Sequence, residues 1–306
     1  MQPIHIRFGG YQPPASVHNK AAEVLGHALA TRLGASVPFE LNGNIVAFGY
    51  QAADLLTMVE SGVMTMGYFS ASYLAARVPE FALLDLPFTI NDRQKAYAVL
   101  DGGLGQLLAD KLHASTGFRL LALWDNGFRH LTNAVRPIRT PRDCVGLRLR
   151  TLFSDVHQRV FQLLGFEPVA LDVKELIAGV QSGAIEAQEN PLTNIYHFGI
   201  HRYHRYITLS GHFFGAAVLL CHRPSYACWP TEVRQAIEES VHDATAAQRR
   251  FAAAEDDDVL TKLRLAQNEI IHLTDAERAP FVAAVAPVLD EQRRLFGDPL
   301  CSDLVS

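Results

Sequence analysis

Apolar residues in the first 70 positions follow two spacings in turn. The two-residue spacing of a strand and the longer spacing of an amphipathic helix alternate, and each predicted helix ends at a glycine, Gly34 or Gly62. The strands are predicted at 4–10, 37–43 and 63–70, and the helices at 19–34 and 51–62. This β-α-β-α-β order is typical of a parallel sheet with helices on its faces.

The rest of the chain continues the alternation with longer elements. The stretch 118–133 is too long for an ordinary strand, and Gly127 within it could let the strand run from one sheet into another. Further strands are predicted at 146–151, 167–172, 184–190 and 205–222, and helices at 155–165, 173–183 and 229–269. The pattern indicates an α/β protein with two lobes and several crossings between them.

Two local details accompany these elements. In the helix 229–269, Pro230 lies near the start and Thr231 is the expected N-cap. The glycine-rich stretch 101–106 lies between helical segments and is predicted to be a turn. We expect lobe I to comprise 1–124 plus 213–250, lobe II to comprise 125–212 plus 251–306, and a ligand to bind in the cleft between them.

Composition narrows the class of protein. The 306 residues are 49% hydrophobic and 19% charged, as in folded globular proteins, and the net charge of −5 gives no support for binding nucleic acid. No run of 18 apolar residues is present, so no membrane insertion is expected. The first ten residues lack the basic and apolar segments of a signal peptide. We therefore expect either a cytosolic protein or an exported one whose signal is absent from this sequence.

Cysteines and clustered histidines are the first candidates for special chemistry. None of the four cysteines forms a CxxC pair. Cys221 and Cys228 are close enough to bridge across a turn, although four free, mostly buried thiols are the favoured interpretation. His197, His201 and His204 would share one face of a helix and could hold zinc. Because no HExxH pattern is present and arginines crowd the segment, solvated imidazoles are favoured over a metal site.

Three polar residues are candidates for binding an anion. In the strand at 146–151, Leu147 and Leu149 alternate with Arg148 and Arg150. Arg150 lies either on the solvated face of an edge strand or in a clamp for a carboxylate, which matches the planar guanidinium. Arg129 lies either in a surface salt bridge or in a second donor position, and Asn190 either caps a turn or helix or donates its amide to the same carboxylate.

Motifs of an enzyme are scarce. GxSxG, GxxxxGK[ST] and a GxGxxG after a strand are all absent from the sequence. An enzyme acting on an organic acid nevertheless remains an alternative, with His18 or His212 as the general base. A ligand-sensing module that docks to a signalling receptor is a further alternative.

An ordered series of motifs adds a resemblance. The segments GFRHLTN, RPIRTPRDCVGLRLR, LLGFEPVAL, KELIAGVQSGAIEAQENPL and ITLSGH follow one another between residues 127 and 212. This series resembles the dicarboxylate-binding (DctP) type of solute-binding protein of the tripartite ATP-independent periplasmic (TRAP) transporters. The resemblance implies a two-lobed periplasmic-binding-protein-like fold, each lobe a mixed sheet flanked by helices, with hinge strands and a long inter-lobe helix.

The resemblance also implies a set of binding residues. In that family the arginine matching Arg150 forms a salt bridge with the ligand carboxylate, which the residues matching Arg129 and Asn190 help to hold. The first lobe contributes the loop from Tyr11 to His18 and the strand end with Phe69 and Ser70, and Val173 faces them from the other lobe. The histidine matching His212 joins a polar network with the glutamate matching Glu189.

Ligand and partners follow as expectations. The fairly apolar lining favours a monocarboxylate with a flat or aromatic body, although a uronic or aldonic sugar acid stays open. We expect Arg150 to face water in an open cleft until the ligand draws the lobes together. The resemblance implies a periplasmic receptor that delivers its ligand to the membrane permease subunits of a TRAP transporter, with no cofactor and no metal.

Overall fold

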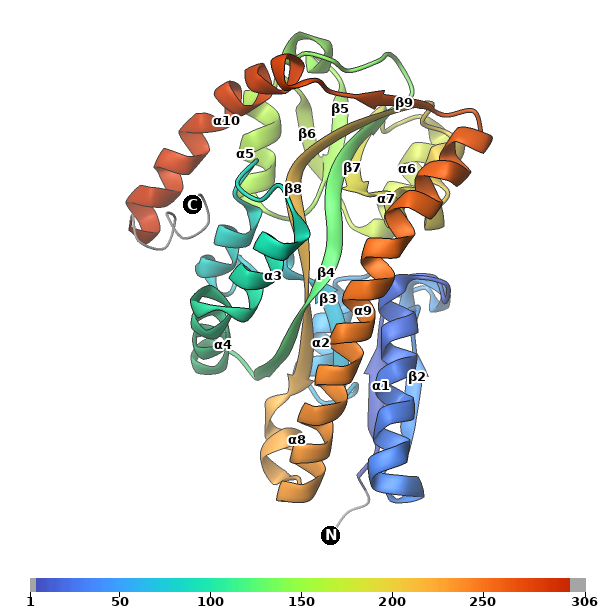
Figure 1. The fold of residues 1–306 in the computed structure, drawn as a ribbon, viewed down its shortest axis with the longest axis vertical. Coiled ribbons are helices and arrows are strands. Elements are labelled where there is room, and N and C mark those ends of the chain that lie inside the picture. The colour runs from blue at the N-terminus through green and yellow to red at the C-terminus, as the bar shows by residue number, and fades with distance from the viewer. Residues whose placement is uncertain (1–3, 298–306) are drawn as a thin grey trace.

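The strands form one mixed sheet that runs the length of the molecule (Figure 1). The computed structural model describes residues 4–297. Within them the sheet has nine strands in the order β2-β1-β3-β8-β4-β7-β5-β6, with β9 paired to β8. The strands are β1 (Ile6–Gly9), β2 (Phe39–Asn42), β3 (Met66–Ser70), β4 (Phe118–Asn133), β5 (Arg148–Thr151), β6 (Glu167–Ala170), β7 (Ala187–Pro191), β8 (Tyr206–His222) and β9 (Glu269–His272).

The two ends of the sheet are parallel, and its centre is antiparallel. β1 pairs in parallel with β2 and β3, which confirms the predicted β-α-β-α-β arrangement, and β5 pairs in parallel with β6 and β7. The long strands β4 and β8 pair with each other and join the two ends. Gly127 of β4 has a φ of 85° at a register shift, where the glycine allows the strand to pass from one half of the molecule to the other.

Helices cover both faces of the sheet (Figure 1). They are α1 (Val17–Leu33), α2 (Asp54–Glu60), α3 (Arg93–Asp101), α4 (Gly103–Ser115), α5 (Asp155–Leu163), α6 (Val173–Ser182), α7 (Leu192–His197), α8 (Arg223–Cys228), α9 (Thr231–Leu265) and α10 (Asp275–Phe296). The long helix α9 packs along α1, β4 and α7, so it contacts both halves as expected of an inter-lobe helix.

Three details of the helices differ from the prediction. Pro230 occupies the N-cap position of α9, and Thr231 is the first helical residue. Proline is tolerated at the start of a helix because a nitrogen there has no hydrogen-bond partner within the helix. Residues 103–106 belong to α4, so the predicted turn is reduced to Gly102 between two helices. α9 ends at Leu265, and Glu269, the last residue of the predicted helix, begins the separate strand β9.

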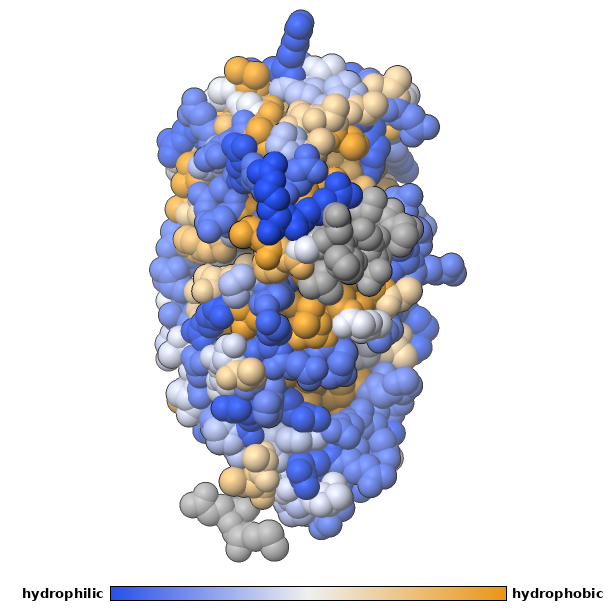
Figure 2. Space-filling model, turned by 90° about the vertical axis from the view of Figure 1, so that its left-hand side faces the viewer, coloured by the Kyte–Doolittle hydropathy of each residue, from blue (hydrophilic) through white to orange (hydrophobic). Residues whose placement is uncertain are grey.

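Each half has its own hydrophobic core. The larger cluster packs the strands β1, β3 and the adjoining part of β8 against α1 and α4, and a second packs β5 against α5 and α10. On the side where α10 ends, apolar residues are exposed between polar ones (Figure 2), and a groove of about 360 Å³ lies among residues of α5, α10 and the segment 75–82. Among residues 4–297, no helix is both long and apolar enough to cross a membrane.

The cysteines are free in the part of the chain that the structure describes. Cys144 and Cys221 are buried, whereas Cys228 is exposed and unbonded to Cys221. Free thiols were the favoured interpretation, and it is confirmed for these three residues. Cys301 lies outside the described residues.

The three clustered histidines do not share a helical face. α7 ends at His197, and His201 belongs to a separate 3-10 turn. His204 is buried and hydrogen-bonded to Thr132, so the prediction of solvated imidazoles is wrong for this residue. Residues 4–297 contain no group of three His, Cys, Asp or Glu side chains that could hold a metal ion.

Candidate functional site

Arg150 lies at the centre of the molecule and is fully buried. Its Nε and Nη2 donate to the carbonyl oxygen of Leu171, at 2.8 and 2.5 Å. Its Nη1 has no hydrogen-bond partner among residues 4–297, and Arg150 makes no ion pair with them. The solvated-edge interpretation is wrong because β5 lies between β6 and β7; Arg148, two residues earlier, is the exposed arginine.

The burial of Arg150 also differs from the open cleft that we expected. Residues of the two halves contact each other around it, as the pairs below show, so the structure is a closed arrangement. A buried guanidinium without a counter-ion costs several kcal/mol, on the order of 3–5 where a partner has been removed. This site therefore favours an anion beside Nη1.

Arg129, the second candidate donor, is held by a buried carboxylate. Its Nε and Nη2 both donate to Glu189, the latter at 2.8 Å to Oε1. Burial raises the pKa of Glu189, but the Arg129 charge and hydrogen bonds from His157 and His212 outweigh it and hold the pKa well below its usual range. Arg129 therefore forms a salt bridge, as one of the two interpretations predicted, but the salt bridge is buried and not on the surface. It neutralises the charge of Arg129 within the protein.

Glu189 lies at the centre of a polar network that includes His212, as the resemblance implied. The His212 Nε2 lies 3.4 Å from Glu189 Oε2, and its Nδ1 lies 2.7 Å from the Ser210 hydroxyl. Burial lowers the pKa of His212 to about 4, which keeps the ring neutral at pH 7. The contact between His212 and Glu189 is present in the structure; its role in the hinge remains a prediction.

His157, which no sequence pattern indicated, extends this network to the other half. Its Nε2 forms an ion pair with Asp85 at 3.1 Å, and its Nδ1 lies 3.6 Å from Glu189. Burial lowers the pKa of His157, but the Asp85 carboxylate outweighs burial, and the net effect raises the pKa. Because Asp85 follows β3 and His157 lies on α5, the ion pair joins the two halves.

A chain of amides crosses the cleft between Asn190 and His18. The Asn190 Oδ1 accepts from Asn194 at 3.2 Å, and the Asn194 Oδ1 accepts from Gln12 at 3.0 Å. The Gln12 Oε1 lies 3.1 Å from the Nδ1 of His18, whose Nε2 has no partner among the described residues. Asn190 lies in β7, and Pro191 takes the N-cap position of α7, so the capping alternative for Asn190 is wrong.

Aromatic side chains form a row on the first half. The rings of Tyr11 and Phe69 lie 5.2 Å apart, and those of Phe69 and Tyr73 lie 4.7 Å apart. Ser70 ends β3 within this row and is buried. Val173, the first residue of α6, is buried in the core cluster of the first half although it belongs to the second. The structure thus brings Tyr11, Phe69 and Ser70 together, while their role as the lining of the site stays a prediction.

Sequence reasoning missed three polar members of this lining. Gln12, Tyr73 and Asn194 are each one to four residues from a predicted site residue, so the short distance along the chain was the available signal. Their amide and hydroxyl groups would add polar contacts to the fairly apolar lining that we expected.

A second set of contacts joins the halves at the start of α6. The Asp172 carboxylate accepts from the backbone N–H groups of Ala52 at 3.0 Å and Ala53 at 3.1 Å. The Nζ of Lys174 donates to the Gly49 carbonyl oxygen at 2.8 Å. These bonds occur only when the segment 49–53 lies against α6, so they stabilise the closed arrangement.

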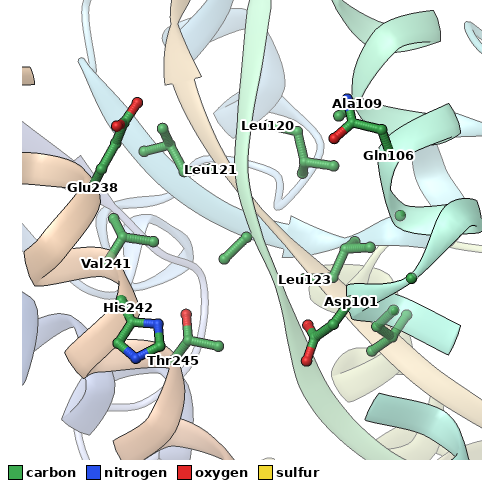
Figure 3. A pocket seen from close by; sticks show the side chains of 14 residues that line it. Asp101, Gln106, Ala109, Leu120, Leu121, Leu123, Glu238, Val241, His242 and Thr245 are labelled. Atoms are coloured by element: carbon green, nitrogen blue, oxygen red, sulfur yellow. The ribbon is translucent and has the colours of Figure 1, made fainter. Parts of the chain in front are cut away.

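A surface groove of about 420 Å³ between α4 and α9 is not the site. Leu121 and Leu123 of β4 lie between the two helices (Figure 3). The charged groups on its rim are already paired, Asp101 with Arg249 and Glu238 with Arg119. Nothing there matches the unpaired charge of Arg150.

Comparisons with known proteins agree with this geometry. The sequence matches the family described as bacterial extracellular solute-binding protein, family 7 (DctP), over residues 8–295. A solute-binding protein of Verminephrobacter eiseniae is 30% identical over 78% of this chain and 70% of its own length. The sugar acid binding protein of Advenella mimigardefordensis, solved in complex with galactonate, is 26% identical, with a TM-score of 0.94 over 100% of this chain and 97% of that one.

A further solved structure carries the name of the transport system. It is a TRAP periplasmic solute-binding protein of Sulfurospirillum deleyianum with bound succinate, 26% identical, with a TM-score of 0.93 over 99% of both chains. The family match spans almost the whole chain, and the fold matches that of these two-lobed proteins. The chain therefore belongs to bacterial extracellular solute-binding protein family 7, the DctP family of TRAP transporter receptors.

Proposed function

We propose that this receptor captures an organic acid with a single carboxylate, by closing its two halves around the carboxylate and Arg150. The observation that carries the proposal is the fully buried Arg150 guanidinium, which has an unpartnered Nη1 and no ion pair within residues 4–297. A carboxylate matches this group in charge and in geometry. The rival hypothesis of an enzyme is wrong, because the family consists of solute-binding proteins of transporters.

The balance of buried charge supports one carboxylate rather than two. The Arg129 charge is matched by Glu189, and the His157 charge by Asp85. Arg150 is the cation left over in this cluster, so a second ligand carboxylate would be buried without a counter-ion, at a cost of several kcal/mol. The relatives differ on this point, since one binds galactonate and another succinate, which has two carboxylates.

The body of the ligand is proposed from the rest of the lining. The aromatic row of Tyr11, Phe69 and Tyr73 suits a flat or ring-shaped body. The unpartnered Nε2 of His18 and the amides of Gln12 and Asn194 suit hydroxyl groups. A sugar acid uses both kinds of contact and is the first candidate, and an aromatic monocarboxylate is the second.

The remaining steps of transport follow from the family. We propose that one half comprises residues 1–124 plus 213–250 and the other 125–212 plus 251–306. The chain then crosses between the halves at 124/125 in β4 and at 212/213 in β8, and we place the hinge at these two crossings. His212 and Glu189 lie beside that hinge and would transmit closure. We further propose a periplasmic location and delivery of the ligand to the permease subunits of a TRAP transporter.

Thermal unfolding with a panel of acids tests the proposed function. The panel comprises galactonate, benzoate and succinate, each titrated up to millimolar concentrations, with Arg150→Ala and the exposed Arg148→Ala as matched variants. A ligand at 100 times its Kd stabilises by about 2.7 kcal/mol, which raises the Tm of a chain of 306 residues by about 4 °C. We expect a monocarboxylate to shift the wild type and Arg148→Ala equally and to shift Arg150→Ala much less at the same concentration. A shift that is largest with succinate, or that is undiminished in Arg150→Ala, contradicts the proposal.

A further inference from the structure

Two buried donors face each other across the closed cleft without partners. Among residues 4–297, neither the Nη1 of Arg150 nor the hydroxyl of Tyr73 makes a well-formed hydrogen bond. Tyr73 comes from the first half, in the 3-10 turn 71–74 that follows β3, whereas Arg150 comes from β5 of the second half. An unsatisfied buried polar group costs about 1–3 kcal/mol, so two such groups in one place indicate a partner common to both.

Packing fixes the position of the Tyr73 ring. It lies edge-on to Phe69 at 4.7 Å, with an interplanar angle of 68°. It also lies edge-on to Phe153 at 6.0 Å, and Phe153 follows β5 only three residues after Arg150. The hydroxyl of the first half is therefore held beside the strand end that carries the guanidinium of the second.

The electrostatic surroundings keep the Tyr73 hydroxyl protonated. Burial raises its pKa, and Arg150 opposes this both by its charge and by hydrogen bonding to the hydroxyl oxygen, which places the two groups side by side. Because a guanidinium can only donate, the proton of the Tyr73 hydroxyl remains available. Asp172 also acts on Tyr73, but its carboxylate already accepts from the N–H groups of Ala52 and Ala53. The hydroxyl is thus a neutral donor that is free to bind a ligand oxygen.

We propose that Tyr73 completes the carboxylate clamp as a specificity-determining residue, its hydroxyl donating to one ligand oxygen while Arg150 Nη1 donates to the other. This inference rests on the proposed function and names a further residue of the same site. Because the two donors belong to different halves, both bonds form only in the closed state. The carboxylate itself therefore links recognition to closure.

Tyr73→Phe tests this inference because it removes the hydroxyl and keeps the ring. A hydrogen bond to a charged group contributes about 1.5–3 kcal/mol, so we expect the Kd to rise about ten- to a hundred-fold. Without ligand, the variant removes an unsatisfied group, so its Tm should be equal to or higher than that of the wild type. This opposite pair of effects distinguishes a binding role from a structural one. Tyr203→Phe, at an exposed position, is the matched control.

Calorimetry with the acid of the panel that stabilises the wild type most provides the measurement. In an Arg150→Lys background, Tyr73→Phe should cost clearly less than in the wild type, because the two side chains share one carboxylate. An unchanged Kd in Tyr73→Phe, a lower Tm of the unliganded variant, or full additivity with Arg150→Lys overturns the inference. Failure of every acid to bind the wild type refutes the proposed function instead, and the inference with it.

Discussion

Replacing Arg150 perturbs the site at a buried cation that forms no ion pair within residues 4–297. In the structure its Nε and Nη2 are occupied by the Leu171 carbonyl oxygen, and only Nη1 remains for a ligand. Lysine keeps the charge, but a single ammonium group cannot reproduce this planar arrangement of donors. Truncating one partner of a buried charge pair costs about 2–5 kcal/mol, which corresponds to a rise in Kd from about thirty-fold to several thousand-fold. We therefore expect at least about a thirty-fold rise in Arg150→Lys, and more in Arg150→Ala.

Isothermal titration calorimetry with the bound acid of the panel measures this change. Circular dichroism and the Tm without ligand establish that each variant is folded. Arg148→Lys is the matched control, since Arg148 lies on the same strand but is exposed. A Kd of Arg150→Ala within about three-fold of the wild type would show that the carboxylate binds elsewhere, and the charge argument would then be refuted.

Three further perturbations follow from named contacts. Asp172→Asn keeps a good N-cap for α6 but weakens the hydrogen bonds to Ala52 and Ala53 of the other half, so calorimetry should give about a ten-fold higher Kd. Asp92→Asn, at the N-cap of α3, is the control and should leave the Kd unchanged. Burial lowers the pKa of His204 from 6.5 to about 4, so the unfolded state takes up the proton first as pH falls. The unfolding free energy should therefore decrease between pH 6.5 and 4, by up to about 1.4 kcal/mol per pH unit. The variant His204→Gln should flatten the dependence of Tm on pH. Gly127→Ala forces a side chain into a φ of 85°, with its Cβ 3.2 Å from that of Pro191, and urea unfolding should show a loss of about 1–3 kcal/mol, compared with none for Gly103→Ala.

The elements that sequence predicted best are those with a long, regular spacing. β4 occupies 118–133 as predicted, because its two-residue period and Gly127 are both local signals. The helices ending at Gly34 and Gly183 are correct for the same reason, since glycine adopts the positive φ that these ends require. The errors lie where local signals compete, as at Pro230 and Thr231, where both residues favour the start of a helix.

Contacts between the halves could not be predicted from local patterns. Asp172 and Ala52 are 120 residues apart, and only the folded chain brings them together. His204 was expected to be exposed to water because arginines lie near it in the sequence. Its ring is instead buried and hydrogen-bonded to Thr132, 72 residues away. Arg150 was correctly selected as a binding candidate, but its burial depends on the closed arrangement, which no spacing within β5 can indicate.

The buried charges explain why closing and binding are coupled in this protein. Glu189 matches Arg129 within the second half, whereas the Asp85–His157 ion pair and the bonds from Ala52 and Ala53 to Asp172 join the halves and stabilise the closed form. Burial of Arg150 opposes closure, because it removes water from the guanidinium and no carboxylate among residues 4–297 forms an ion pair with it. A ligand carboxylate converts that cost into an attraction and so shifts the population toward the closed state. The buried charge of Arg150 thereby makes closure depend on the ligand, while the contacts around it fix the geometry of the closed form.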